Sequence, residues 1–144
     1  MRIGLYCGSF DPFHKGHLNI YQKAKQIFDR VFICKGVNPE KQLRSQMLTI
    51  SGISISDIVH YDYLTTTLID NLSTPSDSVT LIRGLRNGYD YDYEMNQIQV
   101  MRDILKSLQV VMIPCDRAYS HISSSMIRAL QKFDVVEAQK YLPE

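Results

Sequence analysis

The sequence contains no tryptophan and only three cysteines, Cys7, Cys34 and Cys115, with no C-x-x-C spacing. An odd number of thiols without such a pair argues against a disulfide-stapled secreted scaffold, so we expect reduced thiols and a cytoplasmic protein. No apolar run approaches the length of a membrane span, and the first predicted strand begins directly after Met1-Arg2, so we expect no signal peptide. A formal net charge of +1 without a basic block gives no reason to expect a nucleic-acid partner.

Two common phosphate-binding patterns are also missing. Neither the G-x-x-x-x-G-K-[ST] spacing of a P-loop nor the G-x-G-x-x-G of a dinucleotide fold occurs. The remaining composition is ordinary, with 44% apolar and 22% charged residues in 144 positions. This length predicts one domain, residues 1–144, with a single well-buried core.

The most informative stretch covers residues 3–17. A short apolar run ends at Gly8-Ser9, an Asp11-Pro12 turn follows, and a helical pattern opens at Gly16-His17. In nucleotide-binding α/β units, the N–H groups of such a turn and of the helix N-terminus face one pocket. His14 and His17 stand three apart at the helix mouth. Zinc ligation by this pair is disfavoured because no third ligand lies nearby in the sequence.

Strands and helices alternate along the rest of the chain. Strands are predicted at 31–34, 57–61, 79–82 and 109–113, and helices at 17–30 and 63–72. Three more helices are predicted: a long one after the strand that ends near Arg86, one after Ser125, and a short one capped by Asp134. Residues 47–50 are predicted to form a short helical turn. The expected inner faces are Leu18, Tyr21, Ala24, Ile27 and Phe28; Leu64, Leu68, Ile69 and Leu72; and Tyr91, Met95, Ile98, Met101, Leu105 and Leu108. The pattern predicts an α/β protein with a five-stranded parallel sheet covered on both faces.

Polar side chains follow most of the predicted strands. Ser9, His14 and His17 follow the first strand, Lys41 the second, Arg83 and Arg86 the fourth, and Ser120 to Ser125 the fifth. Because the carboxyl ends of parallel strands meet at one edge, these groups should converge on one crevice. Several cations and two helix N-termini suit a polyphosphate better than a neutral ligand. The serine run could alternatively serve only as a helix cap.

Four motifs occur in the order found in bacterial-type phosphopantetheine adenylyltransferases, which belong to the nucleotidyltransferase superfamily with HxGH and ISSS motifs. They are Gly8-Ser9-Phe10-Asp11-Pro12, Ile82-Arg83-Gly84-Leu85-Arg86, Tyr91-Asp92-Tyr93-Glu94-Met95 and Ile122-Ser123-Ser124-Ser125. The chain resembles this family over most of its length. The resemblance implies a Rossmann-like nucleotidyltransferase fold and a homohexamer. It also implies adenylyl transfer from ATP to 4′-phosphopantetheine, giving dephospho-coenzyme A and pyrophosphate.

The resemblance also implies roles for individual residues. His17, Lys41 and Arg83 would be catalytic, and Ser9, Lys41, Thr65 and Arg83 would meet the acceptor. The ATP-binding set would be Ser9, Phe10, His17, Gly84, Leu85, Arg86, Glu94, Tyr119, Ser120, His121, Ile122, Ser123, Ser124 and Ser125. An acceptor phosphate is already a nucleophile, so the reaction needs alignment and charge stabilisation at the α-phosphorus. Mg²⁺ would bind through the ATP phosphates, which fits a sequence without a dense carboxylate cluster.

Three departures from the family pattern leave alternatives open. His14-Lys15-Gly16-His17 is closer to the first motif of nicotinamide or nicotinate mononucleotide adenylyltransferases. Residues 42–56 form a shorter segment than the helical region of the family, and Thr65 stands where the family often has an apolar residue. A pyridine-mononucleotide adenylyltransferase is therefore the alternative enzyme, and a nucleotide-binding module without turnover is the alternative of another class.

Overall fold

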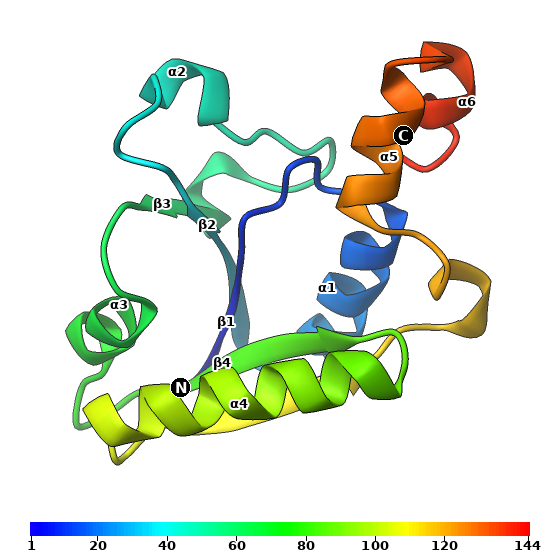
Figure 1. Ribbon diagram of the computed structural model, residues 1–144. Helices are drawn as coiled ribbons and strands as arrows, with labels where there is room; N and C mark the ends of the chain where they lie inside the picture. Colours follow the sequence, from blue (N-terminus) through cyan, green and yellow to red (C-terminus); the bar gives the residue numbers. More distant parts are fainter.

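The computed structural model describes all residues, 1–144, and its five strands form one parallel sheet in the order β3-β2-β1-β4-β5 (Figure 1). The strands are β1 (Arg2–Gly8), β2 (Arg30–Gly36), β3 (Ile58–Tyr61), β4 (Ser78–Leu85) and β5 (Val110–Pro114). Because β1 pairs with β2 on one side and with β4 on the other, the strand order reverses between β1 and β4. Open parallel sheets bind ligands at the carboxyl ends beside such a switch point. The predicted parallel five-stranded sheet is confirmed.

The helices cover both faces of this sheet, as predicted (Figure 1). They are α1 (Lys15–Ile27), α2 (Leu43–Gln46), α3 (Thr65–Leu72), α4 (Gly88–Ile104), α5 (Ser124–Gln131) and α6 (Val135–Gln139), with short 3₁₀ turns η1 (Ile55–Asp57) and η2 (Arg117–Tyr119). Alternate residues of β1 point to opposite faces. Tyr6 packs in one cluster with residues of α1, whereas Leu5 and Cys7 pack in another with residues of α3. None of the helices combines the length and apolar character that crossing a membrane requires.

The two C-terminal helices, α5 and α6, pack together, and the start of α5 lies at the carboxyl edge of the sheet. Their small shared core contains Ile122, Ile127 and Ala138. The carbonyl oxygen of Tyr141 accepts a hydrogen bond from the N–H of Lys15 at 2.9 Å, which joins the end of the chain to the start of α1. The hydroxyl of Ser124 donates to the carbonyl of Pro12 at 2.9 Å. The N-terminus of α5 is therefore fixed against the turn that follows β1.

The first helix and the segment after β2 differ from the predictions. Helix α1 begins at Lys15 and ends at Ile27, whose side chain is 43% exposed, because the chain turns extended at Phe28 to enter β2. Residues 47–50 are not a helical turn; the short helix α2 lies before them. The amide of Gln46 bonds to both the N–H and the carbonyl of Asn38, and the Leu48 N–H donates to His60 Nε2 at 2.9 Å. These bonds hold the segment extended.

The predicted inner faces of α3 and α4 are only partly right. Leu64 precedes α3 and is 61% exposed, and Tyr91 of α4 is 49% exposed. Leu105 and Leu108 lie beyond the end of α4. Within the helix, Ile98 is the only buried apolar side chain. The first turns of α4 pass beside the carboxyl end of β4, where buried Glu94 faces a polar cavity instead of the core. The final strand runs one residue later than expected, and the predicted Asp134 cap of α6 is confirmed. One domain over residues 1–144 remains a prediction.

Candidate functional site

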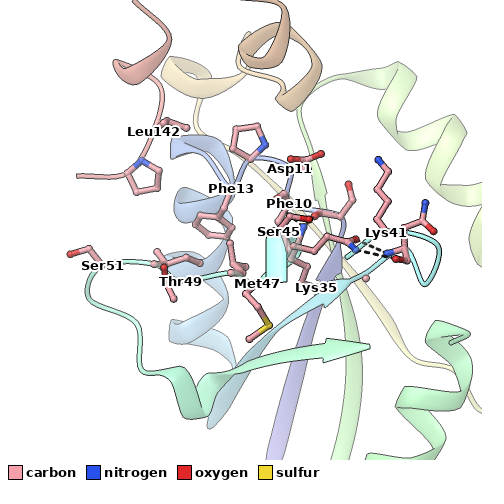
Figure 2. Close-up of a pocket in the computed structure, with 18 residues that line it drawn as sticks. Phe10, Asp11, Phe13, Lys35, Lys41, Ser45, Met47, Thr49, Ser51 and Leu142 are labelled. Atoms are coloured by element: carbon pink, nitrogen blue, oxygen red, sulfur yellow. Dashed lines mark hydrogen bonds between the residues drawn. The ribbon is translucent and has the colours of Figure 1, made fainter. Parts of the chain in front are cut away.

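Two cavities open at the carboxyl edge of the sheet, one on each side of the Ser9–Phe10 turn. The switch-point cavity, about 570 Å³, lies between the ends of β1 and β4, the start of α1 and the N-terminus of α5. The loop cavity, about 610 Å³, lies between the turn at residues 9–13 and the segment at residues 38–51 (Figure 2). Ser9 and Phe10 line both cavities. A ligand that crosses this turn could therefore occupy both.

His14 and His17 meet at the start of α1 and line the switch-point cavity. Their rings stack with centroids 3.7 Å apart. The Nδ1 of His14 accepts hydrogen bonds from the N–H groups of Gly16, at 3.0 Å, and His17, at 3.4 Å. In return, the backbone N–H of His14 donates to His17 Nδ1 at 3.1 Å. The two histidines therefore form a reciprocal cap that fixes the His17 side chain at the helix mouth.

This cap determines the protonation of both rings. A ring nitrogen that accepts a hydrogen bond carries no proton, so both neutral imidazoles hold their proton on Nε2. Burial, together with the positive charge of Arg86, lowers the pKa of His14 to about 4. Burial, then His14 and Arg86, lowers the pKa of His17 well below its usual value. His17 is therefore a neutral hydrogen-bond donor at physiological pH.

The N-terminus of α5 supplies a second group of donors. Ser123 caps the helix, with its hydroxyl oxygen accepting from the N–H of Met126 at 3.1 Å. Ser124 occupies the first helical position, and Ser123, Ser124 and Ser125 all line the switch-point cavity. The first N–H groups of a helix have no partner within it and carry a partial positive charge. The serine run is thus a cap that also presents donors to the cavity.

Two arginines add positive charge beside these donors. Arg86 forms a two-bond ion pair with Asp90, at 3.0 and 3.1 Å, and its other terminal nitrogen lies 3.4 Å from the carbonyl oxygen of Ile122. Arg128, one turn into α5, donates to the carbonyl of Asp11. Both arginines line the cavity. Arg128 was not predicted as a site residue, although it lies four residues after Ser124 and hence on the same helix face.

Arg83 and Glu94 form the most buried ion pair of the cavity. The Nε and one terminal nitrogen of Arg83 donate to the two carboxylate oxygens of Glu94 at 2.5 and 2.9 Å, and the other terminal nitrogen donates to the Cys7 carbonyl at 3.2 Å. Burial alone would lower the pKa of Arg83, but the hydrogen bonds and charge of Glu94 raise it above its ordinary value. A guanidinium has five N–H bonds, so two donors, one on each terminal nitrogen, remain for a ligand.

Gly84 permits the close packing behind this site. A β-carbon at Gly84 would approach the side chain of Ile20 on α1 to 3.1 Å. Such a contact is tighter than ordinary van der Waals packing, so a residue with a β-carbon here would require the Ile20 side chain to shift by a few tenths of an ångström. Gly84, Leu85 and Arg86 all line the switch-point cavity, where the resemblance expected them.

The loop cavity has a different wall. Lys41 lines it, together with Ser45, Gln46 and the apolar side chains of Phe10 and Phe13 (Figure 2). Among residues 38–51 only Ile50 is buried. Lys35, at the end of β2, also lines this cavity and is 7% exposed. Lys35 was not predicted, because a single lysine at the end of an apolar run gives no signal of its own.

The structure does not bring all predicted residues together. Lys41 and Arg83 line different cavities, which meet at Ser9 and Phe10. The hydroxyl of Thr65 is hydrogen-bonded to the Tyr61 hydroxyl at 2.9 Å, and Thr65 lines neither cavity. Tyr119, Ser120, His121 and Ile122 also lie outside both linings. Ligand contacts by these residues remain predictions.

The carboxylates of the switch-point cavity restrict how it can hold a metal ion. Asp90 and Glu94 are both engaged by arginines, and no group of three or more His, Cys, Asp or Glu side chains could hold a metal ion directly. A divalent cation that reaches this cavity would have to enter with its own oxygen ligands, as Mg²⁺ does on nucleotide phosphates. The residues present fit a metal carried by its ligand.

The sequence is similar to those of known proteins over most of its length. Residues 5–130 match the cytidylyltransferase-like family. The chain is 32% identical to the phosphopantetheine adenylyltransferase of Mycoplasma capricolum over 140 residues, which covers 91% of this chain and 97% of the relative. It is 33% identical to the phosphopantetheine adenylyltransferase of Chloroflexus aggregans over 134 residues, which covers 90% of this chain and 83% of the relative.

A solved structure gives the same result for the fold. The chain superposes with a TM-score of 0.61 and 15% identity on a bifunctional NMN adenylyltransferase/ADP ribose pyrophosphatase from Francisella tularensis, complexed with AMP and a Mn ion. The match covers 98% of this chain and 44% of that chain. At this identity the likeness concerns the fold alone.

Proposed function

This chain belongs to the cytidylyltransferase-like family and, within it, to the phosphopantetheine adenylyltransferases, and from that premise we propose that it transfers the adenylyl group of ATP to 4′-phosphopantetheine. The products are dephospho-coenzyme A and pyrophosphate. The observation that carries the proposal is the convergence of neutral His17, the α5 N-terminus and three arginines on one cavity at the switch point of the sheet.

The switch-point cavity receives ATP in this proposal. The N–H groups of Ser124 and Ser125 and the side chains of Arg86 and Arg128 surround the phosphates with hydrogen-bond donors. His17 directs its Nε2–H toward the α-phosphate, because its Nδ1 is already occupied by the His14 N–H. A neutral imidazole donor stabilises charge that develops on a phosphoryl oxygen without giving up its proton.

The reaction itself is an in-line displacement. A phosphate oxygen of the acceptor attacks the α-phosphorus, the bond from that phosphorus to the bridging oxygen of the β-phosphate breaks, and pyrophosphate leaves with that electron pair. No covalent enzyme intermediate is required, because the acceptor phosphate is already an anionic nucleophile. The chain contributes alignment, and donors to the oxygens on which charge increases.

The acceptor phosphate reaches this phosphorus beside Ser9, between the two cavities. Arg83 keeps one free N–H on each terminal nitrogen, so it has two hydrogen bonds left to donate to a phosphate. Lys41 approaches from the loop cavity and adds a second positive charge. Glu94 acts on this side by holding Arg83, and its direct contact with ATP stays a prediction.

Mg²⁺ bound to ATP would supply partial neutralisation of the phosphate charge in this proposal. The carboxylates of the cavity are paired with arginines, so the ion would be held by the nucleotide and not by Asp90 or Glu94. The protein's own residues position the nucleotide around it.

Kinetics with alternative acceptors test the assignment. The rate of pyrophosphate release from ATP and Mg²⁺ is measured with 4′-phosphopantetheine, nicotinamide mononucleotide and nicotinate mononucleotide in parallel, with His17→Ala as the blank. Of the three acceptors, we expect only 4′-phosphopantetheine to give pyrophosphate release. If only a pyridine mononucleotide gives release, the chain would instead be a pyridine-mononucleotide adenylyltransferase, the enzyme whose first motif His14-Lys15-Gly16-His17 resembles. ATP binding without release for any acceptor would indicate a binding module.

The cytoplasmic location and the homohexamer implied by the family resemblance are part of the same proposal. All three cysteines are free thiols, which agrees with a reducing compartment. Light scattering of the purified chain measures the assembly directly. A mass of six chains supports the hexamer, and a monomer contradicts it.

A further inference from the structure

Lys35 is a buried charge that the proposed reaction leaves without a role. It lies at the carboxyl end of β2, in register with Gly8 of β1, and is 7% exposed. It forms no salt bridge, although a buried lysine is ordinarily paired with an acid. A charge kept here without a carboxylate partner is costly to bury, which indicates a role for its hydrogen bonds.

Those hydrogen bonds go to the turn that separates the two cavities. The ammonium of Lys35 donates to the carbonyl oxygen of Ser9 and lies 3.5 Å from that of Phe10. Phe10 has φ of +43°, in the left-handed region that non-glycine residues seldom adopt. Such a conformation persists only when its surroundings hold it. Lys35 is the side chain that holds both carbonyls on either side of this strained residue.

The Ser9–Phe10 turn also packs against His17, the proposed catalytic histidine. The Phe10 ring meets the His17 ring edge-on, with centroids 5.0 Å apart and planes at 88°. Phe10 also packs against Tyr6 at 5.0 Å and Phe13 at 5.4 Å. A turn that relaxed away from φ of +43° would carry the Phe10 ring with it, and the imidazole of His17 would lose one of its walls.

We propose that Lys35 is a positioning residue, whose ammonium locks the Ser9–Phe10 turn so that Phe10 holds His17 in line with the reacting phosphates. The kinetic consequence rests on the proposed function, whereas the structural consequence does not. Lys35 itself touches no substrate in this account. Its effect should therefore fall on kcat and leave the binding of ATP and of the acceptor nearly unchanged.

The charges around Lys35 set its pH dependence. Burial lowers the pKa of Lys35, and the carboxylate of Asp11 partly opposes this effect. His60 of β3 stands beside Lys35 in register, and Lys41 lines the same cavity. As pH rises, Lys35 loses its charge and one of its donors earlier than an ordinary lysine does. The kcat of the wild-type chain should fall over that range.

The test compares Lys35→Met with Lys106→Met, which removes an exposed lysine that lines neither cavity. We expect Lys35→Met to lower kcat by roughly tenfold or more, with both KM values within about threefold, because misalignment chiefly affects the transition state. The alkaline fall in kcat should disappear in this variant. Lys35→Arg, which keeps charge and donors, should recover part of the lost kcat.

A second measurement needs no turnover. Nitrogen-15 spectra of the imidazoles, recorded without substrate, should show shifted His17 signals in Lys35→Met and unchanged signals in Lys106→Met. The melting temperature of Lys35→Met should lie below that of the wild type, because the Ser9 and Phe10 carbonyls lose their donor. If this variant does not fold, Lys35→Gln should show the same loss of kcat and the same shift. A kcat within about twofold of wild type together with unshifted His17 signals would overturn the proposal.

Discussion

The two cavities at the carboxyl edge of the sheet are built in different ways. Side chains in the switch-point cavity are held by one another, as in the His14–His17 cap, the Arg83–Glu94 pair and the Arg86–Asp90 pair. The loop cavity is bounded on one side by residues 38–51, of which only Ile50 is buried. One side of the site is thus preorganised by paired side chains, whereas the segment on the other side is held by a few hydrogen bonds and by little buried packing.

This difference agrees with the division of labour in the proposed reaction. Stabilising a transition state requires donors that are fixed before charge develops, and those donors lie in the switch-point cavity. Binding an acceptor with a long flexible arm needs a surface that closes around it, at a cost in ordering. Changes in the switch-point cavity should therefore reduce kcat or ATP binding, and changes in the loop cavity should raise the KM of the acceptor. Arg83 and Lys35 are the exceptions, because both side chains act next to the Ser9–Phe10 turn where the cavities meet.

The largest effect is expected at His17. His17→Ala removes the neutral donor at the α-phosphate, so kcat should fall by roughly two to three orders of magnitude while ATP affinity changes little. Steady-state kinetics and titration calorimetry with ATP measure the two quantities separately. A variant within about threefold of the wild-type kcat would remove His17 from the mechanism.

The buried imidazole of His14 should make folding stability depend on pH. Its folded pKa, about 4, lies below the value of an unfolded histidine, so the unfolded chain binds the proton first as pH falls. Stability is therefore full above the unfolded value and declines as pH drops toward the folded one. Between pH 7 and 5 the wild type should lose about 2 kcal/mol more than His14→Asn, which keeps a capping side chain but does not titrate.

Urea unfolding of both proteins at each pH measures this difference. The carboxylates are the same in both chains, so their contributions cancel in the comparison, whereas His17, whose pKa His14 helps to lower, adds to the difference. Equal losses in the two proteins would mean that His14 is accessible to protons in the folded state.

The next effect concerns the N-terminus of α5. Ser124→Pro removes one backbone N–H at the first helical position, where proline is tolerated, and the preceding Ser123 is already extended. ATP affinity should fall by roughly tenfold or more, because the N–H groups hold the phosphates. Ser124→Ala keeps the N–H and should have a mild effect. Unchanged ATP affinity in a folded proline variant would reduce the serine run to a cap.

Sequence-based prediction succeeded where the position of a residue depends on local spacing. The Gly8–Pro12 turn, His17 and Ser123 to Ser125 could be predicted, because each depends on local spacing that places it beside a helix start. The partner of Arg83, by contrast, is Glu94 of α4, eleven residues away, and only the packing of α4 against β4 reveals it. The open segment at residues 38–51 carried no periodic signal, so its helical turn was placed wrongly.

Single residues whose roles depend on contacts with distant parts of the chain could not be predicted either. Lys35 ends an apolar strand and is identified only by its two carbonyl partners across the β1–β2 pair. Arg128 sits on an amphipathic helix, where an arginine is ordinarily a solvated charge. Thr65 was assigned to the acceptor by family position; the structure shows its hydroxyl bonded to Tyr61, and its contact with the acceptor stays a prediction.

The smallest expected change lies at the boundary between the cavities. Arg83→Lys keeps the positive charge but cannot hold Glu94 with two bonds and still donate two hydrogen bonds to a phosphate. The KM for 4′-phosphopantetheine should rise by roughly fivefold to tenfold, and the KM for ATP should stay nearly fixed. Arg102→Lys, on the exposed face of α4, is the matched control. A rise in the KM for ATP alone would place Arg83 on the nucleotide side.

The most direct test of the account is the identity of the product. The purified chain is incubated with ATP, Mg²⁺ and 4′-phosphopantetheine, and the mixture is analysed by mass spectrometry alongside a pyrophosphate assay. The account predicts dephospho-coenzyme A, with one pyrophosphate released for each molecule formed. If no adenylylated pantetheine is formed, while nicotinamide mononucleotide under the same conditions yields a dinucleotide, the assignment of the acceptor is contradicted.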